Sequence, residues 1–165
     1  MAINLQPYKF ITYSPNYYSF LTDKGIEYIC YFTPYGEYFT NYPSAISSQF
    51  YSFNLELANK KIKPKGIDKR IADTVVTIVG DYRSSKTNAV VYVCDNSDGR
   101  EAARSRKFLS WFEYYDYPSS KIMQLTSNFT IGGLFIYSSL LIHKKNKHFN
   151  EMVHAYLDLT KAGEK

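Results

Sequence analysis

The chain has 165 residues, with 20 Lys and Arg against 15 Asp and Glu, which gives a net charge of +5 at pH 7. This length suits one domain over residues 1–165 and is enough to bury a sizeable core. The start of the chain lacks the basic residues and apolar stretch of a secretory signal. The most apolar window, residues 131–142, is short and interrupted by glycine and serine pairs. We therefore expect a cytoplasmic protein with no membrane-spanning segment.

Aromatic and basic residues are distributed unevenly. The chain contains 17 Tyr and 11 Phe but a single Trp, and tyrosine is typical of strands, half-buried faces and recognition surfaces. Residues 59–107 contain twelve Lys and Arg against six Asp and Glu, whereas residues 1–58 contain two against four. A basic middle third fits a partner that carries phosphate, such as nucleic acid, and it equally fits a solvated surface.

Residues 8–57 have the pattern of a β-meander. Short turns containing glycine or proline separate four predicted strands: residues 17–22, 26–32, 37–40 and 51–57. The last of these strands has the clearest alternation of apolar and polar side chains. Residues 41–48 are predicted to be a connection that contains proline and serine.

A helix is predicted over residues 67–82, because apolar side chains recur there at helical spacing: Ile67, Ile71, Val75, Ile78 and Tyr82. The charged residues 68–70 and Asp73 then lie on the solvent side. The β-branched run 75–79 also suits a buried strand, but the spacing favours the helix.

The remaining elements are a strand at 89–94, a helix from about 99 to 115, strands at 121–125 and 134–143, and a helix from about 147 to 160. Gly132-Gly133 fits a turn between the two later strands. This order predicts an α+β domain. We expect an antiparallel or mixed sheet, built from the N-terminal meander and the later strands, with three helices packed mainly on one face.

The best functional candidate is the junction at residues 90–112, where an apolar strand ends at a polar loop that leads into a helix. Asp98 to Glu101 has the D-x-x-E form of a capping box, which is a structural role. The candidate ligand-binding residues are an exposed stripe on this helix and the acid that ends the strand: Arg100, Arg104, Lys107, Trp111 and Asp95.

Arginine binds phosphate through two parallel hydrogen bonds, and an aromatic ring provides a surface on which a base stacks. The alternative is a solvated helix face with Trp111 turned into the core. Four lysines in the loop 60–65 form a second basic element, for which a solubility role is the alternative.

Metal, cofactor and catalytic sites have less support. Asp95 and Asp98 have no partner acidic motif at a recognisable spacing, so we predict neither a metal nor a cofactor. Cys94 and His143 both lie near the ends of predicted strands, so a thiol–imidazole pair is conceivable. Cys30 and Cys94 lack CxxC neighbours and are predicted to be buried thiols.

Two stretches carry a family resemblance: residues 92–112, YVCDNSDGREAARSRKFLSWF, and residues 137–146, YSSLLIHKKN. Together they resemble a family of short bacterial proteins that is defined as a domain of unknown function, and the similarity covers most of the chain from Tyr51 onward. The resemblance implies a single-domain, bacterial, cytoplasmic protein and supplies no activity.

Three classes of function remain open. The leading hypothesis is a small binding module for a phosphate-bearing ligand or nucleic acid, which uses the basic helix face with Trp111 or nearby tyrosines stacking. The second is a protein–protein interaction module that uses a Tyr-rich sheet face. The third is a small enzyme with Asp95, Cys94 and His143 in a cleft, so the sequence leaves open whether the protein is an enzyme.

Overall fold

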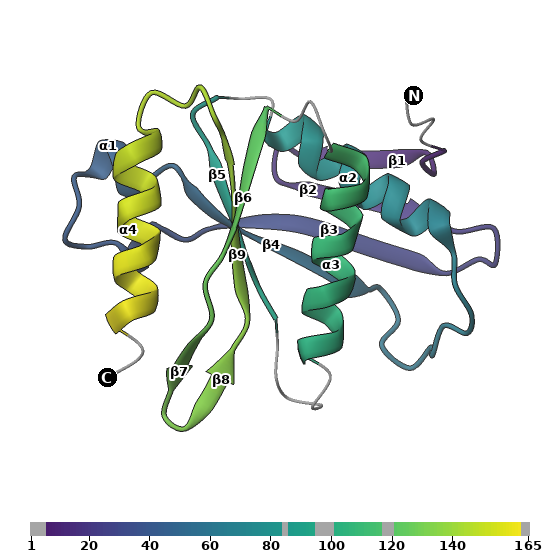
Figure 1. The fold of residues 1–165 in the computed structure, drawn as a ribbon. Helices are drawn as coiled ribbons and strands as arrows, with labels where there is room; N and C mark the ends of the chain where they lie inside the picture. Colours follow the sequence, from purple (N-terminus) through teal and green to yellow (C-terminus); the bar gives the residue numbers. More distant parts are fainter. Residues whose placement is uncertain (1–5, 84–85, 95–100, 117–120, 163–165) are drawn as a thin grey trace.

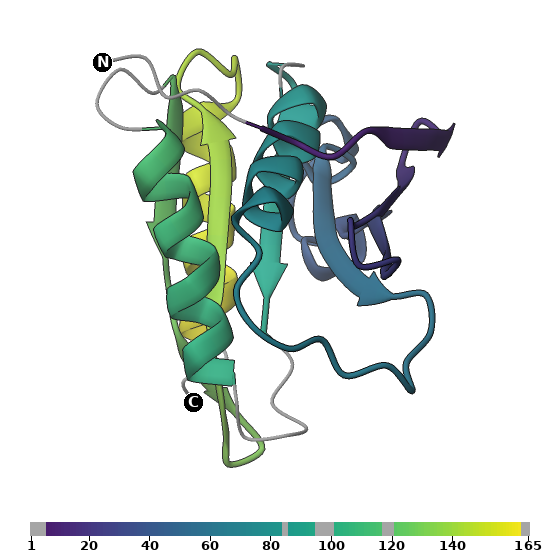
Figure 2. The same cartoon turned by 90° about the vertical axis from the view of Figure 1, so that its right-hand side faces the viewer.

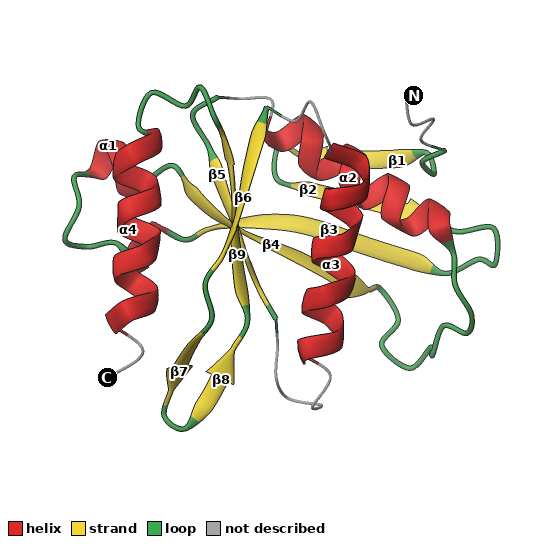
Figure 3. Cartoon of the chain, in the orientation of Figure 1, coloured by secondary structure: helices red, strands yellow, loops and turns green. Residues whose placement is uncertain are grey.

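The computed structural model describes residues 6–83, 86–94, 101–116 and 121–162 (Figure 1). Its helices are α1 (Ser44–Ser47), α2 (Lys69–Arg83), α3 (Glu101–Asp116) and α4 (Phe149–Ala162), with a 3-10 turn, η1 (Gly36–Tyr38). Its strands are β1 (Phe10–Ser14), β2 (Tyr17–Leu21), β3 (Glu27–Pro34), β4 (Phe50–Leu57), β5 (Ala89–Val93), β6 (Ile122–Thr126), β7 (Phe129–Ile131), β8 (Leu134–Ile136) and β9 (Ser138–His143) (Figure 3). The α+β prediction is confirmed.

Seven strands form one mixed sheet in the order β1-β2-β3-β4-β5-β9-β6. The first four strands form an antiparallel meander within residues 8–57, as the sequence predicts, but β1 is a strand that the sequence pattern does not identify. β5 then pairs with β4 in parallel, which requires a long crossover connection that α2 provides. β9 lies between β5 and β6 and pairs with both in an antiparallel manner.

Helices cover both faces of the sheet (Figure 1). α2 and α3 lie on one face, above a core that includes Phe53, Val90 and Leu141. α4 lies on the opposite face with α1, above a second core that includes Phe50 and Leu140. Two of the three long helices thus share a face, and the third packs on the other side because the apolar residues at the centre of β5 and β9 are buried on both sides of the sheet.

The predicted helix at 67–82 is confirmed as α2, and its β-branched run is buried, with Val75, Ile78 and Val79 each 0% exposed. Two details of the prediction are wrong. Ile67 precedes the helix and is 93% exposed. Asp73 is buried, because the chain before β1 crosses over it and the Gln6 amide donates to its carboxylate at 2.9 Å.

Three other local predictions differ from the structure. Residues 37–40 do not form a strand: the Phe39 amide donates to the Gly36 carbonyl at 2.9 Å, which closes the 3-10 turn η1. The connection at 41–48 contains α1. The strand predicted at 134–143 divides at Tyr137, because β8 leaves the sheet to pair with β7 around Gly132 and Gly133. Both glycines have positive φ, 57° and 81°, which fits the predicted turn.

Candidate functional site

Only part of the predicted ligand site lies within the described residues. Asp95 and Arg100 lie outside them, as does the proposed capping box at Asp98, and for Arg104 the structure describes only a position on α3. Lys107 is exposed, and its Nζ lies 5.6 Å from the centroid of the Trp111 ring.

Trp111 is half-buried and packs against the core under α2 and α3. Packing against the core is what the structural alternative for Trp111 predicts, and part of the side chain stays exposed beside Lys107.

The thiol–imidazole pair does not form. β5 and β9 are antiparallel, with Val93 opposite Ser138 and Ala89 opposite Ile142. Cys94 follows β5 opposite Tyr137, whereas His143 ends β9 at the other end of the strand pair. The two residues are therefore about 20 Å apart along the strands. The prediction of a catalytic cleft that contains both Cys94 and His143 is therefore wrong.

Both cysteines are buried, as predicted, and neither forms a disulfide bond. Burial raises the pKa of the Cys30 thiol well above its ordinary value.

The most unusual surface in the structure lies on β1–β4, on the side that faces away from α2 and α3. α1 and α4 pack against β5, β9 and the start of β4 on this side, and they leave the outer strands open (Figure 2). We call this surface the tyrosine face. Its residues alternate along the strands with those that face α2 and α3, and all of them except the buried Ser19 are at least partly exposed: Ile11, Tyr13, Tyr17, Ser19, Leu21, Glu27, Ile29, Tyr31, Thr33, Ser52, Asn54 and Glu56.

The large apolar side chains on the tyrosine face are more exposed than is usual for the surface of a sheet. Ile11 is 58% exposed, Tyr13 63%, Tyr17 39% and Leu21 59%. An antiparallel sheet with one solvated face normally carries polar side chains at outward positions. Clusters of exposed apolar side chains are a recurring feature of contact surfaces in proteins.

Aromatic rings cross the tyrosine face from strand to strand. Tyr13 of β1 meets Tyr17 of β2 edge-on at 6.5 Å between centroids, and Tyr17 stacks on Tyr31 of β3 at 5.3 Å. The Tyr31 hydroxyl donates to Oε1 of Glu56 on β4 at 2.9 Å. Partial burial, and then this hydrogen bond, raise the pKa of Tyr31. The row is pre-ordered by its own contacts.

The strand pairing explains why these side chains meet. Tyr17 pairs with Tyr31, and Tyr31 pairs with Asn54, so the three side chains lie in one row across the sheet. Cross-strand aromatic pairs stabilise such rows. A tyrosine-rich sheet face is among the hypotheses drawn from the sequence, but the registers that bring Tyr13, Tyr17 and Tyr31 together are long-range features.

Charge on the tyrosine face is sparse and acidic. The four described strands β1–β4 contain no Lys or Arg, and their only charged residues are Glu27 and Glu56. Lys24, in the turn between β2 and β3, extends elsewhere and donates to the Lys65 carbonyl at 3.1 Å. The exposed basic residues Arg106 and Lys107 belong to α3, which covers the other side of the sheet.

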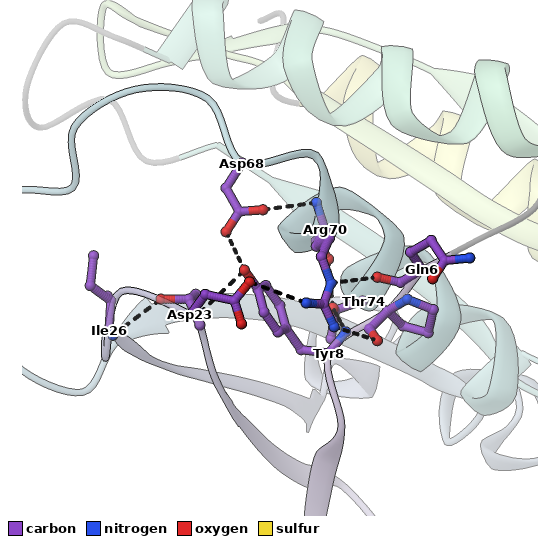
Figure 4. A network of polar contacts seen from close by, with 9 residues as sticks. Gln6, Tyr8, Asp23, Ile26, Asp68, Arg70 and Thr74 are labelled. Atoms are coloured by element: carbon purple, nitrogen blue, oxygen red, sulfur yellow. Dashed lines mark hydrogen bonds and ion pairs between the residues drawn. The ribbon is translucent and has the colours of Figure 1, made fainter.

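A polar network joins α2 to the segment before β1 (Figure 4). The Arg70 guanidinium lies 3.9 Å from the centroid of the Tyr8 ring and contacts Asp23 at 3.3 Å. The Tyr8 hydroxyl donates to Asp68 at 2.7 Å. Burial of Tyr8, and then its bond to Asp68, raise its pKa. We assign this network a structural role, because its atoms bind one another.

A second polar cluster lies beside a shallow cleft between α1 and α4. The Tyr42 hydroxyl donates to Asp158 at 2.6 Å, and His154 contacts the same carboxylate oxygen at 3.3 Å. The bond to Asp158 raises the pKa of Tyr42 to about 12. Lining the cleft are Tyr42, Pro43, Ile46, Asn150, Glu151 and His154.

Within the described ranges, no three acidic, histidine or cysteine side chains come together in a way that could hold a metal ion. Nor is any helix of the described chain long and apolar enough to cross a membrane.

The fold and the exposed row of rings define an α+β protein with a partly uncovered, aromatic sheet face. Residues 67–158 match the family of unknown function DUF6169, and the chain belongs to that family. The match covers the region from α2 into α4, whereas the tyrosine face lies N-terminal to it. No curated protein and no solved structure matches the chain.

Proposed function

We propose that this protein is a recognition module that binds another protein through the tyrosine face. The observation that supports it is the exposed row formed by Tyr13, Tyr17 and Tyr31 on the half of the sheet that α1 and α4 leave open. Tyrosine is enriched in interface cores because its ring provides a large contact area with few torsions to immobilise. Thr33, Ser52 and Asn54 border the row with partly exposed polar groups that bond to one another, and such groups are typical of interfaces.

The charge of the face favours a protein partner over nucleic acid. Affinity for a phosphate backbone comes mainly from Lys and Arg, and strands β1–β4 contain neither residue. Glu27 and Glu56 would repel phosphates.

Selection from a displayed random peptide library tests this proposal. The wild-type protein is compared with the double variant Tyr13→Ser/Tyr17→Ser, and Tyr38→Ser serves as the control because Tyr38 is 52% exposed but lies on η1. We expect the same peptides to be enriched by the wild type and by the control. Their affinity for the double variant should be about 10- to 100-fold lower than for the wild type, which is typical of losing central aromatic contacts. Equal enrichment by all three proteins would refute the proposal.

A phosphate-bearing ligand bound at α3 is the second candidate, favoured by the exposure of Arg106 and Lys107. Its test is the binding of labelled single-stranded RNA and DNA across a salt series, beside an Arg100→Ala/Arg104→Ala double variant. Binding that weakens steeply with salt and disappears in the folded double variant would establish this function. An affinity that the two substitutions leave unchanged would exclude this second candidate function.

The proposal includes the setting of the protein. We propose that the chain acts as one domain in a bacterial cytoplasm, on the basis of the family resemblance and of Cys30 and Cys94, which are buried and not joined in a disulfide. Fractionation of cells that express the tagged protein tests the compartment.

A further inference from the structure

Within the tyrosine face, the aromatic row ends at a carboxylate. Tyr17 stacks on Tyr31, and the hydroxyl of Tyr31 binds Glu56, which is exposed. The row therefore presents π faces beside a negative charge. Since β1–β4 contribute no basic side chain, the cation that would complement this pair has to come from outside the face.

The same protein contains a completed version of this arrangement. At the start of α2, the hydroxyl of Tyr8 binds the carboxylate of Asp68, as that of Tyr31 binds Glu56. There the guanidinium of Arg70 lies over the tyrosine ring at 3.9 Å and contacts a second carboxylate, Asp23. A planar cation thus fits a tyrosine that is held by a carboxylate, because it stacks on the ring and pairs with an acid at the same time.

We infer that the partner of the tyrosine face is a protein segment that presents arginine, whose guanidinium stacks on the rings of Tyr17 and Tyr31 and pairs with Glu56. This inference rests on the proposed function of the same face. Arginine fits better than lysine because its planar, weakly hydrated group stacks on an aromatic ring while it forms two hydrogen bonds to a carboxylate. The apolar residues Ile11 and Leu21 supply contacts for the rest of the segment.

The first experiment measures the binding of three fluorescent peptides by anisotropy. All have the same length and alternate Gly and Ser with three copies of arginine, lysine or citrulline, which is planar like arginine but uncharged. The protein has a net charge of +5, so non-specific attraction of the cationic peptides is disfavoured. We expect the arginine peptide to bind about two- to fivefold more tightly than either of the others.

Substitutions on the face complete the test. Glu56→Gln should lower the affinity for the arginine peptide by about two- to fivefold, as expected for the loss of an exposed ion pair. Tyr17→Leu should lower the same affinity by about fivefold, because stacking on the ring is lost. Glu37→Gln is the matched control, since Glu37 is exposed but lies on η1. Circular dichroism confirms that each variant is folded.

The outcomes separate this inference from the proposed function. Equal affinities for the arginine and lysine peptides, or an arginine affinity that Glu56→Gln leaves unchanged, would overturn the arginine assignment. Library peptides that depend on Tyr13 and Tyr17 but lack arginine would overturn it too, while the proposed function would stand. If no peptide depends on the tyrosines, both fail.

Discussion

Arg70 is expected to be the most costly exposed side chain to remove, because it ties α2 to the segment that enters β1 (Figure 4). Its Nε donates to the Gln6 carbonyl at 2.9 Å and its Nη2 to the Pro7 carbonyl at 3.3 Å. A hydrogen bond from a charged donor contributes about 1.5 kcal/mol at the low end, and the guanidinium over Tyr8 adds about 0.5–1 kcal/mol. After a discount for the 40% exposure of the side chain, Arg70→Ala should lower the free energy of unfolding by about 2–3 kcal/mol.

The ion pair contributes little of this effect. Asp23 is 77% exposed, so Asp23→Asn should cost at most about 1 kcal/mol. Arg70→Lys keeps a positive charge but loses the planar donor fork, so its cost should be intermediate. Urea unfolding at pH 7, followed by circular dichroism at low and high salt, measures all three variants. If Asp23→Asn lowered the free energy of unfolding as much as Arg70→Ala, the reasoning would be refuted, because the ion pair would then account for most of the contribution of Arg70.

Three further changes test other parts of the structure. Gly36→Ala should lower the melting temperature, because a Cβ there would lie 2.5 Å from the carbonyl oxygen of Ser47, the last residue of α1. Gly80→Ala should instead stabilise α2 by about 0.5–1 kcal/mol, because a Cβ there meets no atom within 4 Å. A higher melting temperature for Gly36→Ala than for Gly80→Ala would contradict this prediction. The hydrogen bond to Asp158 raises the pKa of Tyr42 to about 12 from an ordinary 10.0. The bond therefore stabilises the fold below pH 10, and this stabilisation is lost as the pH rises towards 12. Tyr42→Phe should reduce the fall in unfolding free energy between pH 10 and 12, and an unchanged pH dependence would count against the bond. Cys30 is 0% exposed, so a thiol reagent should label it only after unfolding, and rapid labelling of the native protein would show that the core opens there.

Local elements were predictable where one periodicity dominates. Residues 51–57 alternate strictly and form β4, and the spacing of Ile71, Val75, Ile78 and Tyr82 defines α2 despite its β-branched residues. Burial on the sheet outweighs the modest cost of β-branching in a helix. The turn at 37–40 was not predictable in this way, because its conformation depends on contact with α1, which lies later in the chain.

Strand order and register could not be derived, and they decide the site. The sequence places Cys94 and His143 at strand ends, but only the antiparallel pairing of β5 with β9 shows that these are opposite ends. In the same way, the abundance of tyrosine indicates a recognition surface, yet the choice of residues follows from the pairing of Tyr17 with Tyr31. Each pairing joins segments whose local patterns are compatible with other partners.

The hairpin formed by β1 and β2 provides the strongest argument that the tyrosine face makes a contact. Its two strands, FITYS and YYSFL, contain no charged side chain, although alternate positions in each point away from the core. Polar or charged residues at those positions would leave the inner core of Tyr18 and Phe20 unchanged and would protect the edge strand from non-specific pairing. Cross-strand ring contacts give Tyr13 and Tyr17 a stabilising role, but the stability of the isolated fold gives no reason for the exposed side chains of Ile11 and Leu21 in the same hairpin. A partner that covers them does give one, and the acidic charge of Glu27 and Glu56 beside the rings favours a partner that is basic.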